Sequence, residues 1–256
     1  MVSTTANNKW FLAPRPNAQS RLRLFCFPYA GGGSAVYRGW ADRLPRDVEV
    51  CLAQLPGREA RLRETALTSL SQIVDELAEH IKPYLDKPFA FFGHSMGGMI
   101  AFELARRLRS SNGVEPEHLF ISGRRAPQLP YKEPPTYNLP DKEFLAELVR
   151  LNGTPREVLE HEELMLLMLP LLRADFTVCQ TYRYAPGPPL GHPITVFGGL
   201  QDHETGREKL EGWREQTRAA FRLWMLPGDH FFVKTAQAEI LQIMEPTLNA
   251  QKQRFF

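Results

Sequence analysis

A pentapeptide near the middle of the chain constrains it most: residues 93–97 read Gly-His-Ser-Met-Gly. The apolar run 89–92 before it is typical of a buried strand, which we expect over 89–94, and the segment 97–110 after it has the pattern of a helix. A strand, a Gly-x-Ser-x-Gly turn and a helix form a nucleophile elbow, whose sharp turn exposes the central serine. Glycines flank that serine because side chains there would collide. We therefore predict that Ser95 is a nucleophile at the start of a helix.

Two later loops supply an acid and a base, in the chain order that accompanies such an elbow. Residues 193–197 read as a short buried strand, and Asp202 lies on the loop after it. Residues 221–226 read as another strand, and His230 follows it. Parallel strands end at one edge of a sheet, so these loops gather there. We predict a catalytic triad of Ser95, Asp202 and His230.

Other side chains compete for these roles. Glu204 lies two residues after Asp202 and is an alternative acid, and Asp202 has a second interpretation as a cap of the following helix. Among the seven histidines, His94 lies inside the elbow and is expected to point away from the serine. His203 adjoins Asp202, so their side chains diverge. The order of the residues and their strand context favour His230 as the base.

The Gly-rich loop 28–34 follows a strand-like segment at 21–27. An oxyanion hole needs a second backbone N–H, usually from the loop after an early strand, and glycines let the backbone approach a ligand closely. We predict that the N–H groups of Met96 and Ala30 form this hole. A phosphate-binding loop is the alternative, but the Gly-Lys-Ser/Thr ending and the Gly-x-Gly-x-x-Gly spacing are both missing.

Composition limits the classes of function. The chain has 256 residues, of which 43% are hydrophobic, enough for one buried core with an insertion. A net charge of +2 is too small to argue for nucleic-acid binding. Three cysteines favour a reducing compartment, and no secretory signal is apparent, so we expect a cytoplasmic protein. The apolar run 164–172 is too short to span a bilayer, and no membrane role is expected.

Strands alternating with helices predict an α/β fold with a mostly parallel sheet and helices on both faces. Further strands are expected at 48–53 and 118–122, and further helices over about 70–85 and 234–248. Ser69 and Gln72 have the spacing of a capping box. Prolines bracket a helical stretch that interrupts this alternation. We expect residues 1–125 and 187–256 to form the core and residues 126–186 to form an inserted helical lid, an ordinary crossover being the alternative.

Within that stretch, helices are expected over 141–151 and from 156 through 172 towards 182. The second carries a stripe of Met and Leu side chains, at positions 164, 165, 167, 168 and 171. Such a stripe is more often core packing than a special acyl-binding slot. The two interpretations overlap, because the inner face of a lid also lines the substrate pocket.

The chain resembles the stand-alone type II thioesterases associated with polyketide synthases and nonribosomal peptide synthetases, which are α/β hydrolases with a lid. The matching motifs are Trp-Phe at 10–11, Phe-Cys-Phe-Pro-Tyr-Ala-Gly-Gly at 25–32, Leu-Pro-Gly-Arg-Glu at 55–59, Gly-His-Ser-Met-Gly-Gly at 93–98, Leu-Leu-Arg-Ala-Asp-Phe at 171–176 and Gly-Asp-His-Phe-Phe at 228–232. One departure is Gln180, where the family pattern leads us to expect Glu.

The resemblance implies what the residues alone do not. It places the triad on Ser95, Asp202 and His230 and the oxyanion donors on Met96 and Ala30. It implies acyl substrates that are thioester-linked to the phosphopantetheine arm of acyl carrier or peptidyl carrier domains. It also implies an editing role, the removal of aberrant or stalled acyl units. The predicted chemistry needs no metal and no cofactor.

Two basic clusters are candidate docking sites for acidic carrier domains: Arg58, Arg61 and Arg63 in one, Arg124 and Arg125 in the other. The alternative is that these side chains are solvated or hold local loops. A general esterase or acyltransferase on the same fold is the second functional hypothesis, since a fold and a triad do not choose the leaving group. A non-catalytic acyl-binding protein is the third.

Overall fold

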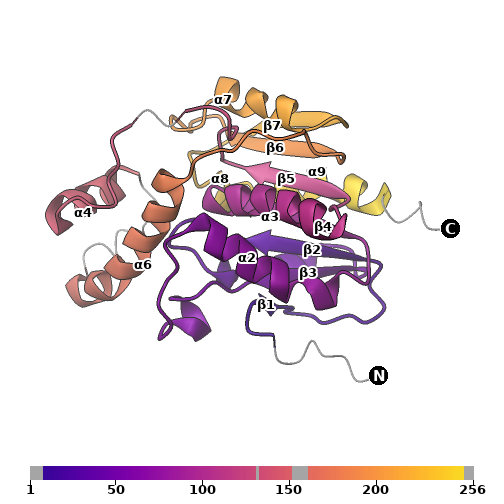
Figure 1. Ribbon diagram of the computed structural model, residues 1–256, viewed down its shortest axis with the longest axis horizontal. Coiled ribbons are helices and arrows are strands. Elements are labelled where there is room, and N and C mark those ends of the chain that lie inside the picture. The colour runs from indigo at the N-terminus through magenta and orange to yellow at the C-terminus, as the bar shows by residue number, and fades with distance from the viewer. Residues whose placement is uncertain (1–7, 131–132, 152–160, 251–256) are drawn as a thin grey trace.

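The computed structural model describes residues 8–130, 133–151 and 161–250, and its centre is one seven-stranded sheet (Figure 1). The strands are β1 (Phe11–Leu12), β2 (Leu22–Phe27), β3 (Val48–Ala53), β4 (Phe89–His94), β5 (His118–Ser122), β6 (Ile194–Gly199) and β7 (Phe221–Leu226). Their order is β1-β3-β2-β4-β5-β6-β7, with β1 antiparallel to β3 and every other pair parallel. The predicted α/β class and mostly parallel sheet are confirmed.

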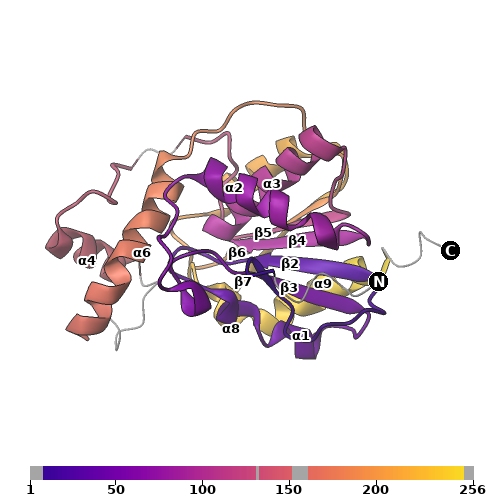
Figure 2. The ribbon, with the colours of Figure 1, turned by 60° about the horizontal axis from the view of Figure 1, so that its bottom comes forward.

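Helices cover both faces of the sheet, with α2 and α3 on one face and α1, α8 and α9 on the other (Figure 2). The helical elements are η2 (Ser34–Tyr37), α1 (Trp40–Arg43), η3 (Glu59–Arg61), α2 (Leu70–His80), η4 (Lys82–Tyr84), α3 (Met96–Asn112), α4 (Asp141–Arg150), α6 (Glu162–Thr181), α7 (Arg207–Glu211), η5 (Gly212–Gln216), α8 (Phe232–Thr235) and α9 (Gln237–Ala250). Because both faces are covered, β2 to β6 are buried along their whole length. The edge strand β7 instead alternates between half-buried and exposed residues over most of its length.

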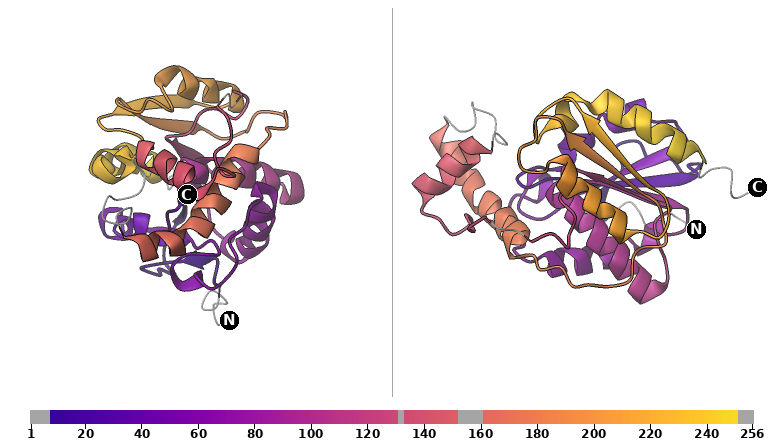
Figure 3. Two further views of the ribbon diagram at one scale, coloured as in Figure 1. Left: turned by 90° about the vertical axis from the view of Figure 1, so that its left-hand side faces the viewer. Right: turned by 90° about the horizontal axis from the view of Figure 1, so that it is seen from above.

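The helices α4 and α6 lie apart from these layers, beside the carboxyl ends of the strands (Figures 1 and 3). They share a small apolar cluster of their own, made by Phe144, Leu148, Met165, Leu169 and Leu172. We call the described residues between β5 and β6 that carry these two helices the α4–α6 segment. The start at residue 156 that the sequence predicts for the second helix lies outside the described residues.

The Met and Leu stripe on α6 divides between two environments. Met165 and Leu171 are buried, whereas Leu167 is 54% exposed. Met168 lines a cavity that also reaches Ser95. The stripe therefore combines core packing with a contribution to the cavity wall.

Helix α6 is also long and apolar enough over Glu163–Thr181 to cross a membrane, by length and composition alone, and 44% of its apolar stretch is buried within the protein. The long helix was predicted from the sequence, but only its most apolar run, 164–172, was compared with the thickness of a bilayer. The core helix of a soluble protein passes the same test. Asp175 lies within the helix, is fully buried and forms an ion pair with Arg58 of the core, which ties α6 to the sheet domain.

Two details differ from the sequence predictions. The capping box at the start of α2 is wrong: Ser69 precedes the helix, but its side chain makes no capping hydrogen bond and lies 2.8 Å from the Ser71 hydroxyl instead. The short strand β1 was not predicted, because two residues are too few to show an alternating pattern.

Candidate active site

The elbow between β4 and α3 places Ser95 in a strained turn. Its backbone has φ 53° and ψ −112°, a conformation that non-glycine residues seldom adopt. A Cβ on Gly93 would lie 2.0 Å from the Gly97 carbonyl oxygen, and a Cβ on Gly97 would lie 2.0 Å from that of Phe27. Only glycine fits at both positions, so the two glycines allow the tight turn that raises the serine above the sheet edge.

A chain of hydrogen bonds links the three predicted side chains, which come from the loops after β4, β6 and β7. The Nε2 atom of His230 lies 3.1 Å from Oγ of Ser95, and its Nδ1 atom lies 2.7 Å from Oδ2 of Asp202. The alternative acid, Glu204, instead pairs with Arg150 at 3.2 Å. In this geometry the carboxylate that contacts the imidazole is Asp202.

The carboxylate of Asp202 is buried, 5% exposed, and is held by its own loop. Its Oδ1 accepts hydrogen bonds from the backbone N–H groups of Glu204 and Thr205, at 2.8 and 3.0 Å, and its Oδ2 accepts one from the Thr205 hydroxyl. Burial raises the pKa of Asp202, but the His230 imidazole and the Thr205 bonds outweigh burial and hold this pKa well below its usual value. The carboxylate therefore stays ionised beside the imidazole.

His94, which precedes the serine in the elbow, is fully buried. Its Nδ1 lies 2.8 Å from the Ser122 hydroxyl, and its ring centroid lies 5.2 Å from that of His230. Burial, reinforced by the neighbouring His230, holds the pKa of His94 well below its usual value. The ring next to His230 is therefore uncharged.

Above the triad is a cavity of about 320 Å³ between the sheet edge and the α4–α6 segment. Its floor includes Ser95, His230 and Ala30, and its apolar wall includes Leu148, Leu151, Met168, Leu172 and Phe176. The wall comes from the α4–α6 segment and the floor from the core. Among the residues that the structure describes, no group of three or more His, Cys, Asp or Glu side chains is placed to hold a metal ion.

The family model for the thioesterase domain matches residues 22–248, nearly the whole of the chain. The chain belongs to the thioesterase family. A similar curated protein is the gramicidin S biosynthesis protein GrsT of Aneurinibacillus migulanus, 50% identical over 237 residues that cover 93% of each chain.

Solved structures agree with this assignment. The type II thioesterase BorB from the borrelidin biosynthetic cluster is 36% identical, with a TM-score of 0.86 over 93% of this chain and 97% of that one. ClbQ from the colibactin pathway is 31% identical, with a TM-score of 0.85 over 90% of this chain and 98% of that one. The relationship to type II thioesterases that the motifs suggested is confirmed.

In this thioesterase the departure at Gln180 has a clear structural role. The Oε1 atom of Gln180 accepts the backbone N–H groups of Thr136 and Tyr137, at 2.7 and 3.1 Å, and its Nε2 donates to the Thr136 hydroxyl at 2.8 Å. The Gln180 amide is 8% exposed and holds the loop before α4. The amide both accepts and donates at this position, whereas an ionised Glu side chain could only accept.

The proposed basic docking clusters are largely wrong for this thioesterase. Arg58 and Arg61 are each 5% exposed, because Arg58 pairs with Asp175 and Arg61 pairs with Glu64. Arg61 also stacks over the Trp10 ring at 4.2 Å. Guanidinium groups that are buried and bonded internally cannot meet a carrier domain.

The second cluster is also engaged within the protein. Arg125 is 8% exposed and lies 3.5 Å from Glu133, and Arg124 lines the cavity. In the first cluster, Arg63 is exposed. Charge at positions 58, 61 and 125 therefore holds loops together, the alternative that the sequence had left open.

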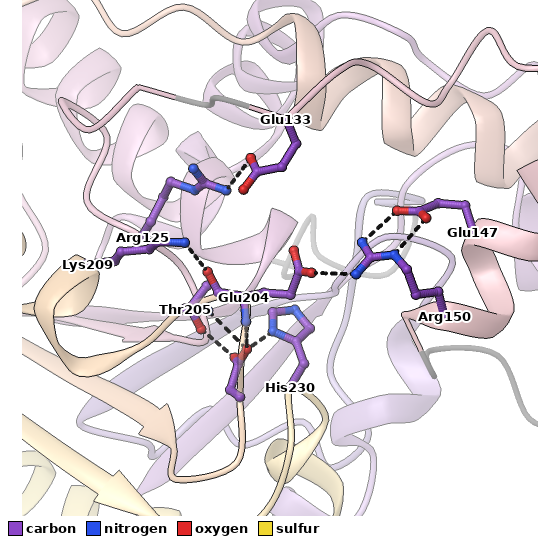
Figure 4. A network of polar contacts seen from close by, with 9 residues as sticks. Arg125, Glu133, Glu147, Arg150, Glu204, Thr205, Lys209 and His230 are labelled. Carbon is purple, nitrogen blue, oxygen red and sulfur yellow. Dashed lines mark hydrogen bonds and ion pairs between the residues drawn. The ribbon is translucent and has the colours of Figure 1, made fainter.

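Polar contacts bridge the α4–α6 segment and the loop that carries the acid (Figure 4). Arg150 of α4 lies between Glu147 of its own helix, at 2.8 Å, and Glu204 of the loop after β6, at 3.2 Å. The Arg150 side chain is 57% exposed and that of Glu204 is 32% exposed. This bridge lies at the surface, unlike the buried pair of Arg58 and Asp175.

That buried pair was not predicted from the sequence. Both residues lie inside family motifs, but Asp175 was assigned no role and Arg58 was a candidate docking residue, with a solvated or loop-holding side chain as the alternative. The available signal was a carboxylate within an otherwise apolar helical run, which needs a partner if it is buried.

Proposed function

We propose that Ser95, His230 and Asp202 form the catalytic triad of this thioesterase, with the N–H groups of Met96 and Ala30 as its oxyanion hole. The observation that carries the proposal is the continuous hydrogen-bonded chain from Ser95 through His230 to Asp202, which opens on the apolar cavity. Met96 is the first residue of α3, so its N–H belongs to the positive end of a 17-residue helix. Ala30 borders the same cavity from the Gly-rich loop.

In the proposed reaction, Oγ of Ser95 attacks the thioester carbonyl while Nε2 of His230 takes the hydroxyl proton. The carbonyl oxygen becomes an oxyanion, which the two backbone N–H groups stabilise. The carbon–sulfur bond then breaks, and the thiol leaves with the proton from His230. Water attacks the acyl-serine, again activated by His230, and releases the carboxylic acid and the free serine. Asp202 fixes the histidine tautomer and stabilises the imidazolium.

The substrates that we propose are acyl groups on the phosphopantetheine arm of acyl carrier or peptidyl carrier domains. GrsT belongs to gramicidin S biosynthesis and BorB to the borrelidin cluster, which supports a role in nonribosomal peptide or polyketide assembly. There the enzyme would remove aberrant or stalled acyl units in the cytoplasm. Its three cysteines are free, which fits a reducing compartment.

We further propose that residues 126–186 act as a lid over this site. The described helices of the segment form the apolar wall of the cavity and share an apolar cluster of their own, although Val178 of α6 also packs in the main core. A lid of this kind would exclude water from the acyl chain and leave the reacting carbonyl at the triad.

Two measurements test the proposal together. A fluorophosphonate probe should label wild-type protein at Ser95 and not the Ser95→Ala variant, which separates an enzyme from an acyl-binding protein. Turnover is then compared for one acyl group on a carrier protein, on coenzyme A and as an oxygen ester. We expect the carrier thioester to be hydrolysed best. Faster hydrolysis of the oxygen ester would identify a general esterase, and transfer to an added alcohol or amine would identify an acyltransferase.

A further inference from the structure

Arg58 and Asp175 form a deeply buried ion pair. Nη2 of Arg58 lies 2.8 Å from Oδ1 of Asp175, and Nη1 lies 2.9 Å from Oδ2, a bidentate arrangement. The two side chains are 5% and 0% exposed. Removing two charges from water costs free energy that their attraction often only offsets, so such a pair is weak evidence for a role in stability. What the pair holds in place is more informative.

Both members bind the backbone of the Gly-rich loop. Oδ2 of Asp175 accepts the N–H of Gly31 at 2.7 Å, and Nη1 of Arg58 donates to the carbonyl oxygen of Gly32 at 2.9 Å. The loop is a turn that closes with a hydrogen bond of 2.9 Å from Gly32 N–H to the Tyr29 carbonyl oxygen. Ala30, the proposed oxyanion donor, is the second residue of this turn.

The turn has two alternative forms, and the pair distinguishes them. Gly31 has φ +74°, the value that a type II turn requires at its third residue. In this form the N–H of the peptide between Ala30 and Gly31 points at the Asp175 carboxylate. Rotating that peptide into the type I form would turn the Ala30 carbonyl oxygen towards the same carboxylate, and two negative groups would repel each other. The carboxylate thus selects one backbone conformation on the C-terminal side of Ala30.

We propose that Arg58 and Asp175 are positioning residues for the oxyanion hole, and that through them the α6 helix sets the catalytic competence of the core. The inference rests on the proposed function, because it assumes that the Ala30 N–H stabilises the oxyanion. Asp175 belongs to α6, and Leu172, one turn earlier, also reaches the loop: its Cδ2 would lie 2.6 Å from a Cβ on Gly31. In this proposal the Gly-rich loop keeps its type II turn, the form that we assign to the active enzyme, as long as α6 is packed against the core.

The chain offers a matched control at the opposite end of β2. Arg23 pairs with Glu49 at 2.7 Å, with side chains 8% and 9% exposed, and it also donates to the Tyr84 carbonyl oxygen at 2.8 Å. This Arg–carboxylate pair is nearly as buried, although Arg23 also pairs with the exposed Asp86, and it lies at the amino end of the strand, away from the cavity. Substitutions in this pair therefore show how much activity and stability are lost when a buried ion pair that does not contact the Gly-rich loop is disrupted.

The experiment compares Arg58→Lys and Asp175→Asn with Arg23→Lys and Glu49→Gln. Each folded variant is titrated with the fluorophosphonate probe, so that kcat is expressed per reactive serine. For Arg58→Lys and Asp175→Asn we expect kcat to fall by about 10- to 100-fold with KM within about twofold, less than the ~10²–10³ lost when an oxyanion donor is removed outright. The two control variants should lose thermal stability and keep kcat within about twofold. If Arg58→Lys does not fold, Asp175→Asn alone tests the proposal, because its side-chain oxygen can still accept a hydrogen bond and the variant is therefore expected to fold.

A second readout isolates the oxyanion hole. A boronic acid forms a tetrahedral adduct on the serine and resembles the transition state, so its inhibition constant should rise in proportion to the loss of kcat in Arg58→Lys and Asp175→Asn. The inference is overturned if these variants keep kcat and boronate affinity while losing only stability, as the control pair does. Failure of the proposed function would look different, because wild-type protein would then neither react at Ser95 nor hydrolyse thioesters.

Discussion

The sheet core and the α4–α6 segment both border the cavity, yet they are held together in different ways. The core packs two large apolar layers against the faces of one sheet and carries the Ser95, His230 and Asp202 side chains on loops at its strand ends. The segment has one small apolar cluster of its own. It meets the core through apolar packing at Val178 and through two charged contacts, one buried, to Arg58, and one exposed, to Glu204. The core thus carries the proposed triad side chains, whereas the segment forms the apolar wall of the cavity and reaches the Gly-rich loop through Asp175.

This difference predicts a division of effects. Changes in the core site should alter kcat by orders of magnitude, because the triad groups act on the reacting atoms. Changes in the part of the segment that forms the cavity wall, unlike those at Asp175, should alter which acyl chain is preferred, by about tenfold, because an apolar wall discriminates by roughly 1–3 kcal/mol per methylene.

The largest effect is expected from Ser95→Ala, which removes the proposed nucleophile. We expect kcat to fall by at least ~10⁴, since loss of the serine removes the covalent route and leaves only binding and the oxyanion hole. Folding should be retained, because the substitution deletes one hydroxyl. Thioester turnover measures the loss, and circular dichroism with a thermal melt checks the fold. A correctly folded variant that retains more than a few per cent of turnover would refute the assignment.

Asp202→Asn comes next. We expect kcat to fall by ~10² to 10⁴, because an amide no longer fixes the His230 tautomer that accepts the serine proton. The matched control is Glu204→Gln, two residues along the same loop, which should lose less than about threefold. Steady-state kinetics of the two variants at one pH provide the comparison. If Glu204→Gln were the more damaging change, the acid would have been misassigned.

Much of the core could be predicted from the sequence because its signals are local. The bounds of β3, β4, β5 and β7 match the predicted ones, since each is a short apolar run between turn residues. The strand β6 continues two residues further than predicted, because Gly198 and Gly199 read as loop but keep pairing with β7. Ser95, Asp202 and His230 could be predicted together because chain order and strand context converge on them.

The failures concern partners that are far apart in sequence. Arg58 was expected at the surface because its partner Asp175 lies 117 positions away, and no local pattern reveals that pairing. Arg61 was a docking candidate too, but its guanidinium stacks on the ring of Trp10, which is also distant in sequence. A lone charged residue has the same appearance in a sequence whether it is solvated or buried in a bidentate pair. Burial decides, and burial depends on the tertiary fold.

Acid should weaken the core through His118. Burial lowers its pKa to about 3, and Nε2 lies 2.8 Å from the Thr195 hydroxyl between β5 and β6. Because the folded pKa lies below the unfolded value of about 6.5, the stability from this group is fully present above pH ~6.5 and is lost as the pH falls towards 3. At pH 4.5 the loss should be roughly 2–3 kcal/mol, or about 5–10 °C in Tm.

The variant His118→Gln tests this directly, since it keeps a polar side chain near Thr195 but cannot take up a proton. Thermal melts of wild type and variant are compared between pH 7 and pH 4.5. The variant should lose less Tm over this range than wild type. Parallel curves would show that acid acts elsewhere in the core.

The cavity wall should control chain-length preference. Met168→Ala removes a side chain that lines the cavity on α6, which should raise kcat/KM for a long acyl chain relative to a short one by about tenfold. Leu166→Ala is the matched control on the same helix, because Leu166 is 61% exposed and should leave the ratio unchanged. A panel of acyl thioesters of increasing length supplies the measurement. An equal shift in both variants would mean that α6 acts through its stability and not through the wall.

The smallest effect is expected at the exposed bridge between Arg150 and Glu204. Ion pairs at this level of exposure contribute ~0.2–1 kcal/mol, so Arg150→Gln should change kcat/KM by less than about threefold and have little effect on Tm. Its effect should appear in local opening instead. Amides of α4 should exchange faster in the variant, whereas those of α6, which Asp175 holds to the core, should not change.

In wild-type protein both helices should exchange faster than α3, because the segment lacks the two-layer packing of the core. Hydrogen exchange read by mass spectrometry resolves the three helices. If α4, α6 and α3 were equally protected, the segment would be an integral part of the core, and the lid proposal would fail.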